Sequence, residues 1–154
     1  MSMFMELYSA AFKTVKELAC VESGENVLIL ADTAIDWEMI KLLASASCLL
    51  QAEPSIMIYQ TRQQVDIEPP SNVAEAMKAS DVIISLPLMY ILHTNAYNEA
   101  LRCGSRILEL TGMDPDMMIR LIGRTDYSTM CKLGDVLTRL TKQAKEVVIK
   151  SEKG

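Results

Sequence analysis

The sequence predicts an α/β fold, with a three-layer, mainly parallel five-stranded sheet that is flavodoxin-like or Rossmann-like. Three observations lead to this class. Short segments such as Val27 to Ala31 are uniformly apolar, which is typical of strands covered on both faces. Segments with apolar residues at three- and four-residue steps, such as Ile35 to Leu50, alternate with them and indicate amphipathic helices. The connections are short, and such alternation produces parallel strands joined by right-handed crossovers.

Composition limits the function before any motif is considered. A chain of 154 residues of which 50% are apolar can bury a sizeable core, and we expect residues 1–154 to form one domain. Aromatic residues are only 5%, so the 11 methionines must supply much of the packing. A formal net charge of -5 argues against a nucleic-acid partner. No apolar run approaches the roughly 20 residues that cross a bilayer, so we expect no membrane partner.

The amino terminus and the cysteines indicate a cytoplasmic protein. The first residues have no basic region ahead of an apolar core, and therefore no signal peptide is expected. The four cysteines are far apart and form no CxxC pair, which favours free thiols over disulfides or a structural zinc site.

The first half of the chain is expected to contain two helices and two strands. We expect a helix over Ser2–Ala19 and then the strand Val27–Ala31. Asp36 is placed to cap the second helix, because an aspartate immediately before an apolar stripe can accept a backbone N–H of the first turn. A second strand is expected over Ser55–Tyr59, and the polar stretch Gln60–Pro70 is expected to be a surface loop.

The second half continues the alternation. Asp114-Pro115 is a strong helix start, since a capping aspartate is followed by proline at the first helical position. Gly104 is expected just beyond the end of a helix. The other expected elements are a helix capped by Asn72, a third strand over Asp81–Leu86, a helix opened by His93 or Thr94, a fourth strand over Arg106–Leu110, a longer helix over Met130–Ala144 and a fifth strand over Glu146–Ile149.

Candidate functional residues follow the strands, because ligands of parallel sheets bind beyond the carboxyl ends of the strands. Asp32 and Thr33 follow the first strand, Asp114 follows the fourth, and His93 opens a helix. Asp32, His93 and Asp114 could converge on a divalent metal. The simpler alternative makes them a turn residue, a helix-entry residue and a helix cap. We therefore assign no catalytic, cofactor-binding or metal-binding residue, and keep these four as candidates for a strand-end cleft.

Other kinds of active site find little support in the sequence. The first crossover contains no glycine-rich phosphate cradle, which excludes the common nucleotide-binding loops. A phosphoryl-accepting receiver domain has the same predicted topology, but Ser85-Leu86-Pro87 stands where its acceptor aspartate would be. Cys103 and Cys131 are expected to be buried structural thiols, since His93 is the single histidine that could serve either as a base.

The stretch Gly24-Glu25-Asn26-Val27-Leu28-Ile29-Leu30-Ala31-Asp32 resembles the amino-terminal domain of the thermophilic metallo-aminopeptidases, the aminopeptidase T-like or leucyl aminopeptidase family. That family has relatives among the dihydroxypyridine dioxygenases. Further similar stretches occur in the same order over nearly the whole chain, at Ala52-Glu53-Pro54, Ala76-Met77-Lys78-Ala79-Ser80-Asp81, His93-Thr94 and Gly104-Ser105-Arg106.

The resemblance implies a domain without its own catalytic centre. In these enzymes the divalent metal lies in a carboxyl-terminal domain, and no metal ligand can be carried onto a residue of this chain. We expect either a fragment or a short homologue of a metal-dependent enzyme that removes amino-terminal residues from peptides. The alternatives are the corresponding domain of a ring-cleaving dihydroxypyridine dioxygenase and a stand-alone binding or oligomerisation module.

A domain that normally packs against another is expected to expose an apolar surface, and so we expect a second domain or a homo-oligomer. The uncharged segment Leu86–Leu92 is the candidate for that surface.

Overall fold

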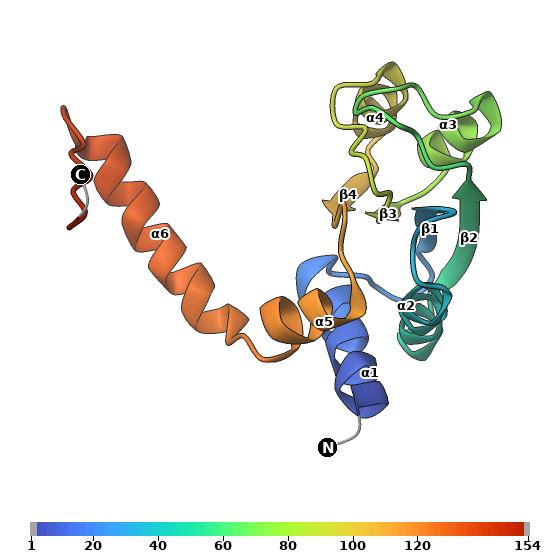
Figure 1. The fold of residues 1–154 in the computed structure, drawn as a ribbon, viewed down its shortest axis with the longest axis horizontal. Coiled ribbons are helices and arrows are strands. Elements are labelled where there is room, and N and C mark those ends of the chain that lie inside the picture. Colours follow the sequence, from blue (N-terminus) through green and yellow to red (C-terminus); the bar gives the residue numbers. More distant parts are fainter. Residues whose placement is uncertain (1–2, 153–154) are drawn as a thin grey trace. The chain divides into compact units, whose positions relative to one another are not determined.

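In the part of the chain that the structure describes, four parallel strands form one sheet, in the order β2-β1-β3-β4 (Figure 1). The computed structural model describes residues 3–152, so the expected helix start at Ser2 lies outside the described residues. This arrangement confirms the predicted α/β class, with an all-parallel sheet flanked by helices. The strands are β1 (Asn26–Asp32), β2 (Glu53–Tyr59), β3 (Val82–Ser85) and β4 (Arg106–Glu109).

The chain divides into two compact units, residues 1–124 and residues 125–154. The sheet and most helices belong to the first unit, and the second unit contains one long helix. The helices are α1 (Met3–Lys13), η1 (Thr14–Leu18), α2 (Trp37–Leu49), α3 (Ser71–Lys78), α4 (Asn95–Arg102), α5 (Pro115–Met117), η2 (Met118–Gly123) and α6 (Tyr127–Gln143), of which η1 and η2 are π-helical. None of the helices within residues 3–152 is both long and apolar enough to cross a membrane.

Strand β1 is the centre of the sheet. It pairs with β2 on one side and with β3 on the other, and its residues from Val27 to Asp32 are all buried. Successive side chains of a strand point to opposite faces. Leu28 accordingly packs with α3 and α4, whereas Ile29 packs with α1 and α2. Both faces of the sheet are therefore covered, as the unbroken apolar run predicted.

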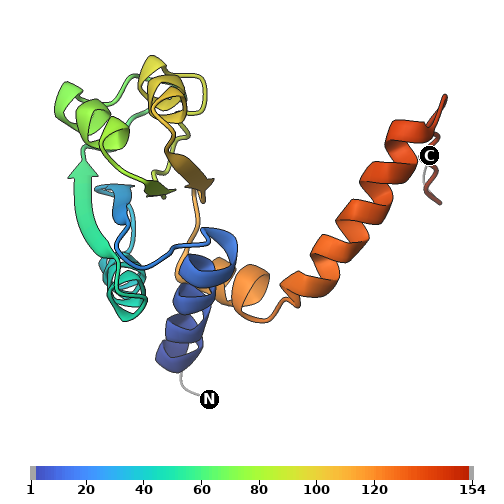
Figure 2. The ribbon, with the colours of Figure 1, turned by 180° about the vertical axis from the view of Figure 1, so that it is seen from behind.

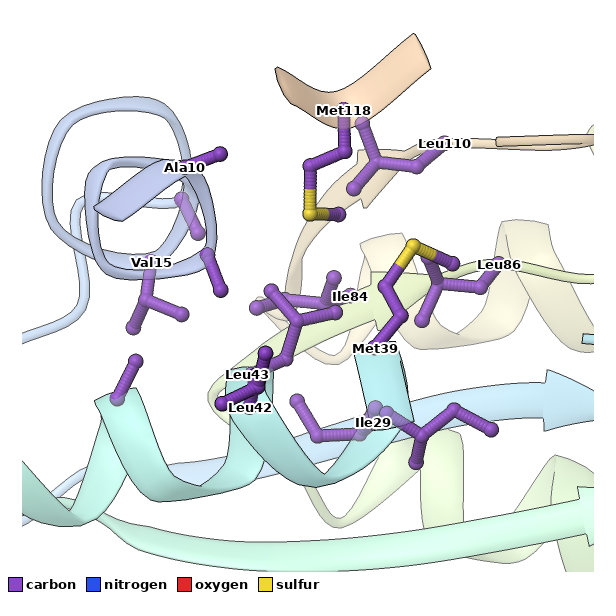
Figure 3. Close-up of a cluster of buried hydrophobic side chains, with 14 of the residues drawn as sticks. Ala10, Val15, Ile29, Met39, Leu42, Leu43, Ile84, Leu86, Leu110 and Met118 are labelled. Carbon is purple, nitrogen blue, oxygen red and sulfur yellow. The ribbon is translucent and has the colours of Figure 1, made fainter. Parts of the chain in front are cut away.

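The larger core cluster lies between the sheet and helices α1, α2 and η2. Met39 from α2 and Met118 from η2 point into the same cluster as Ile29 and Ile84 of the sheet (Figure 3). The methionines thus fill space that aromatic side chains occupy in many cores.

Helices α1 and η2 approach each other closely at Gly123. A Cβ atom added to Gly123 would lie 3.0 Å from the Cβ of Ala10, which makes this a position for glycine. Figure 2, the view from behind, shows α1 lying against the short helical segment that precedes residue 124.

Two of the three predicted helix caps, Asp36 and Asp114, are confirmed, and of the two residues expected to open the next helix it is Thr94 that caps α4. The side chains of Asp36, Thr94 and Asp114 each accept a backbone N–H from the first turn of α2, α4 and α5. The expected cap at Asn72 is wrong, because α3 already begins at Ser71 and its N-cap is Pro70, which offers no side-chain acceptor. Gly104 has φ +100° after α4, the left-handed conformation expected of a glycine beyond a helix end.

The expected fifth strand is the main error in the predicted fold. Residues 146–149 form no strand, and Val147, Val148 and Ile149 are exposed. An isolated run of β-branched residues acquires strand structure only when it finds a hydrogen-bonding edge, and within the described residues this run has none. The sheet is four-stranded for that reason.

Two expectations about burial are also wrong. Cys103 and Cys131 are exposed, because Cys103 follows the last residue of α4 and Cys131 lies on α6, which has no buried residue; both are free thiols as expected. The segment Leu86–Leu92 is not a continuous exposed patch. Leu86 and Ile91 are buried in the two core clusters, and Leu88 is exposed between them.

Candidate functional site

Each of the four strands ends in a polar residue at the carboxyl edge of the sheet. These residues are Asp32, Tyr59, Ser85 and Glu109. Leu30, Ile83 and Ile107, two residues earlier on three of these strands, belong to the cluster under α3 and α4, and Tyr59 itself belongs to that cluster. The two-residue period of a strand therefore places all four polar side chains on the α3/α4 face. We call this row the polar edge.

Asp32 is almost completely buried, with 1% of its surface exposed. One carboxylate oxygen accepts the backbone N–H of Ala34 at 2.9 Å, and the other accepts that of Leu88 at 2.9 Å. Asp32 thereby joins the loop after β1 to the loop after β3. Both carboxylate oxygens accept backbone N–H groups, so the side chain of Asp32 has a structural role in linking the two loops.

Glu109 is the carboxylate of the polar edge that retains an unused acceptor. Its Oε1 accepts the hydroxyl of Ser85 at 3.2 Å and also that of Thr111. Its Oε2 is buried and has no hydrogen-bond partner. Burial raises the pKa of Glu109 above its ordinary value of 4.5, and the hydrogen bonds from Thr111 and Ser85 oppose that rise.

Tyr59 contributes a buried phenol that also lacks a partner. Only 6% of its surface is exposed, and its hydroxyl makes no hydrogen bond. Burial, with the nearby charge of Asp32, raises the pKa of Tyr59 to about 12, so the phenol stays neutral. The guanidinium of Arg62 lies 5.9 Å from the centre of the Tyr59 ring, and the buried Nε of Arg62 has no partner either.

The raised pKa of Glu109 predicts an unusual pH dependence of stability. A carboxyl whose pKa is higher in the folded state stabilises the fold at a pH below 4.5, and this contribution is lost as the pH rises through the folded-state pKa. This loss lowers the free energy of unfolding of the unmodified protein as the pH rises, and we expect the Glu109→Gln variant not to show that decrease. The check is urea denaturation of both proteins between acidic and neutral pH. If the difference in the free energy of unfolding between the two proteins does not change with pH, the pKa of Glu109 is not raised in the folded state.

A separate crevice lies where the loops after β1, β3 and β4 meet. Its volume is about 170 Å³. The crossovers from β1 and β3 run in opposite directions along the sheet, and open α/β sheets bind ligands at this switch point. Of the four candidate residues, Asp114 lines this crevice; the other lining residues are Ala34, Ile35, Asp36, Leu88, Gly112, Met113 and Pro115.

The remaining candidates have local partners. Thr33 shares a hydrogen bond of 3.0 Å with the hydroxyl of Thr61. His93 is exposed; its backbone N–H is donated to Asp66, and its ring meets the edge of Tyr90 with centroids 6.4 Å apart. Among residues 3–152, no three His, Cys, Asp or Glu side chains are grouped so that they could hold a metal. The structure therefore does not bring Asp32, His93 and Asp114 together as a metal site.

Sequence reasoning missed Tyr59, Arg62 and Glu109. The sequence does contain a signal for the strand-end residues, because each strand is an apolar segment whose last residue is polar. These last residues are Asp32, Tyr59, Ser85 and Glu109. The register of the strands is what aligns these positions, with Asp32 opposite Tyr59 and Ser85 opposite Glu109.

Comparison with known proteins gives one family and two similar structures. The profile of the family NicX, 2,5-dihydroxypyridine 5,6-dioxygenase, matches residues 7–154. A 2,5-dihydroxypyridine dioxygenase from Pseudomonas putida KT2440 superimposes with a TM-score of 0.70 at 20% identity, over 96% of this chain and 45% of that one. AmpT from Thermus thermophilus superimposes with a TM-score of 0.50 at 12% identity, over 79% of this chain and 42% of that one. No curated protein matches significantly.

These likenesses correct the order of the two families that the sequence suggested. The family profile is that of the dioxygenases, whereas AmpT is similar in fold alone. The chain spans less than half the length of either solved structure.

Proposed function

Because the chain belongs to the NicX family of 2,5-dihydroxypyridine 5,6-dioxygenases, we propose that it serves as a non-catalytic domain of a ring-cleaving dioxygenase. The family match over residues 7–154 is the observation that supports this proposal. The carboxyl edge of the sheet, with its crevice at the switch point, would form part of the wall of the substrate cleft.

The residues of this chain do not fit a catalytic iron. A common iron site of oxygenases uses two histidines and one carboxylate, and this chain has one histidine. His93 is exposed and belongs to no group of potential ligands among the described residues. We infer that the divalent metal of the parent enzyme is held by a part of the fold that this chain does not span.

A second candidate is the matching domain of a metal-dependent aminopeptidase. The superposition with AmpT favours it, but that superposition covers less of this chain at a lower TM-score than the dioxygenase does. A third candidate is a stand-alone binding or oligomerisation module.

We also propose that a second domain or a second copy of the chain covers helix α6. Four of its apolar residues follow the alternating three- and four-residue steps of a packing seam, and each of the four is more than half exposed. They are Met130, Leu133, Leu137 and Leu140. Light scattering of the purified chain separates the two partners, because a chain that stays monomeric at high concentration excludes a second copy.

Metal retention tests the proposed function. The purified chain, loaded with ferrous iron and dialysed, is expected to keep no stoichiometric iron and to consume no oxygen with 2,5-dihydroxypyridine, since no group of potential metal ligands occurs among residues 3–152. His93→Ala is expected to give the same result as the unmodified chain. One iron per chain that is lost in His93→Ala would overturn the proposal.

A further inference from the structure

Helix α6 carries an apolar seam that stays exposed in the part of the chain that the structure describes. None of the 17 residues of this helix is buried. The α6 seam consists of Met130, Leu133, Leu137 and Leu140, which follow the three- and four-residue steps at which two packed helices meet. A single helix cannot shield such a seam from water by itself, so the seam indicates an interface with another surface.

The charges of α6 favour a second copy of the same helix as that surface. Helical periodicity turns every charged side chain of α6 to the face opposite the seam; these residues are Lys132, Asp135, Arg139 and Lys142. The residues that flank the seam carry no charge, and they include Gly134, Val136, Thr141 and Gln143. Charges at such flanks select a different partner helix, whereas uncharged flanks let two identical helices pack without facing like charges.

Gly134 gives an independent reason to expect a closely packed helix here. It lies in the middle of α6, where glycine is unfavourable because it loses more backbone freedom than other residues do. Apart from its own helix backbone, nothing in the described chain comes within 4 Å of the position of an added Cβ atom. Packing within the chain therefore does not require this glycine, but a second helix could approach closely at this point.

The two ends of the seam favour an antiparallel pair. The helical repeat continues the seam to Asp126, the N-cap residue, and to Ala144, the C-cap residue. Parallel helices would bring the two Asp126 carboxylates together. Antiparallel helices instead place each Asp126 opposite Ala144, at the end of the second helix whose last turn carries Lys142, and they also oppose the two helix dipoles.

We propose that α6 pairs with α6 of a second copy of this chain, antiparallel and across a two-fold axis beside Gly134. Leu133 then packs on Leu137 of the second copy, and Val136 lies next to Val136 of that copy. This inference rests on the proposal above that another surface covers α6, and it commits that proposal to a second copy. It does not depend on the role of the chain in a dioxygenase.

Two lysine substitutions in the full chain test the pairing. Leu137→Lys is expected to raise the dissociation constant of the dimer roughly 10-fold or more, because it places a charge in the seam. Thr138→Lys is the matched control, since it adds the same charge away from the seam and is expected to change the constant by less than about 2-fold. Both variants are expected to keep the sheet folded, because α6 buries no residue.

Sedimentation equilibrium measures both dissociation constants. An unmodified chain that stays monomeric at high concentration, or equal effects of the two substitutions, would overturn the pairing. A second domain would then remain as the cover of α6, and the iron-retention test of the proposed function would be unaffected.

Cross-linking of single-cysteine variants tests the orientation. The four native cysteines are exposed and can be replaced with serine. In that background, Val136→Cys is expected to be joined to its counterpart by a short bis-maleimide, because the axis passes beside this position. Gln143→Cys is expected not to be joined, since antiparallel helices hold the two positions roughly 20 Å or more apart at 1.5 Å per residue. Equal cross-linking at both positions, or none at position 136, would overturn the antiparallel pair.

Discussion

Replacing Leu28 or Ile29 with alanine is expected to lower the free energy of unfolding by about 2–5 kcal/mol. The side chains are 1% and 0% exposed and lie on opposite faces of the central strand, so each truncation leaves a cavity in a different core cluster. Chemical denaturation followed by circular dichroism measures both losses.

Leu49→Ala is the matched control for these truncations. Leu49 lies on α2 with 57% of its surface exposed, and its truncation is expected to change stability by less than about 0.5 kcal/mol. Losses at Leu28 and Ile29 no larger than that of the control would mean that β1 is not the centre of the fold.

Asp32→Ala is expected to cost about 2–5 kcal/mol, because it leaves the backbone N–H groups of Ala34 and Leu88 without their acceptor. Asp32→Asn keeps the size of the side chain and one acceptor, and is expected to cost less. Denaturant titration gives both values.

Asp114→Ala provides the comparison for Asp32. Asp114 caps α5 through a single hydrogen bond to Met117 and is exposed, so its loss is expected to cost about 1 kcal/mol. If Asp32→Ala proves no more costly than Asp114→Ala, Asp32 does not fasten the two loops, and a role in binding would have to be reconsidered.

The sequence predicted those parts of the fold that depend on local patterns. The apolar run around Leu28 required a strand with two covered faces, and Asp36, Thr94 and Asp114 carry the chemistry of helix caps. Both signals depend on residues within one or two turns of each other.

The errors concern properties that depend on distant partners. The run Glu146–Ile149 has the composition of a strand, but a strand forms only beside a free edge. The polar edge depends on strand register, which places Glu109 beside Ser85, and on burial of Tyr59 by α3. Neither register nor the covering helix can be read from the residues around Tyr59 alone.

The mass of the native polypeptide tests the central claim most directly. This chain has a mass of 17.1 kDa and covers 45% of the solved dioxygenase that it superimposes on. An antibody against the chain, used on cells that produce the protein, is expected to isolate a polypeptide of about twice that mass, or a tight complex of that size, which retains iron. A native polypeptide of 17.1 kDa that holds stoichiometric iron and cleaves the ring without a partner would contradict the account.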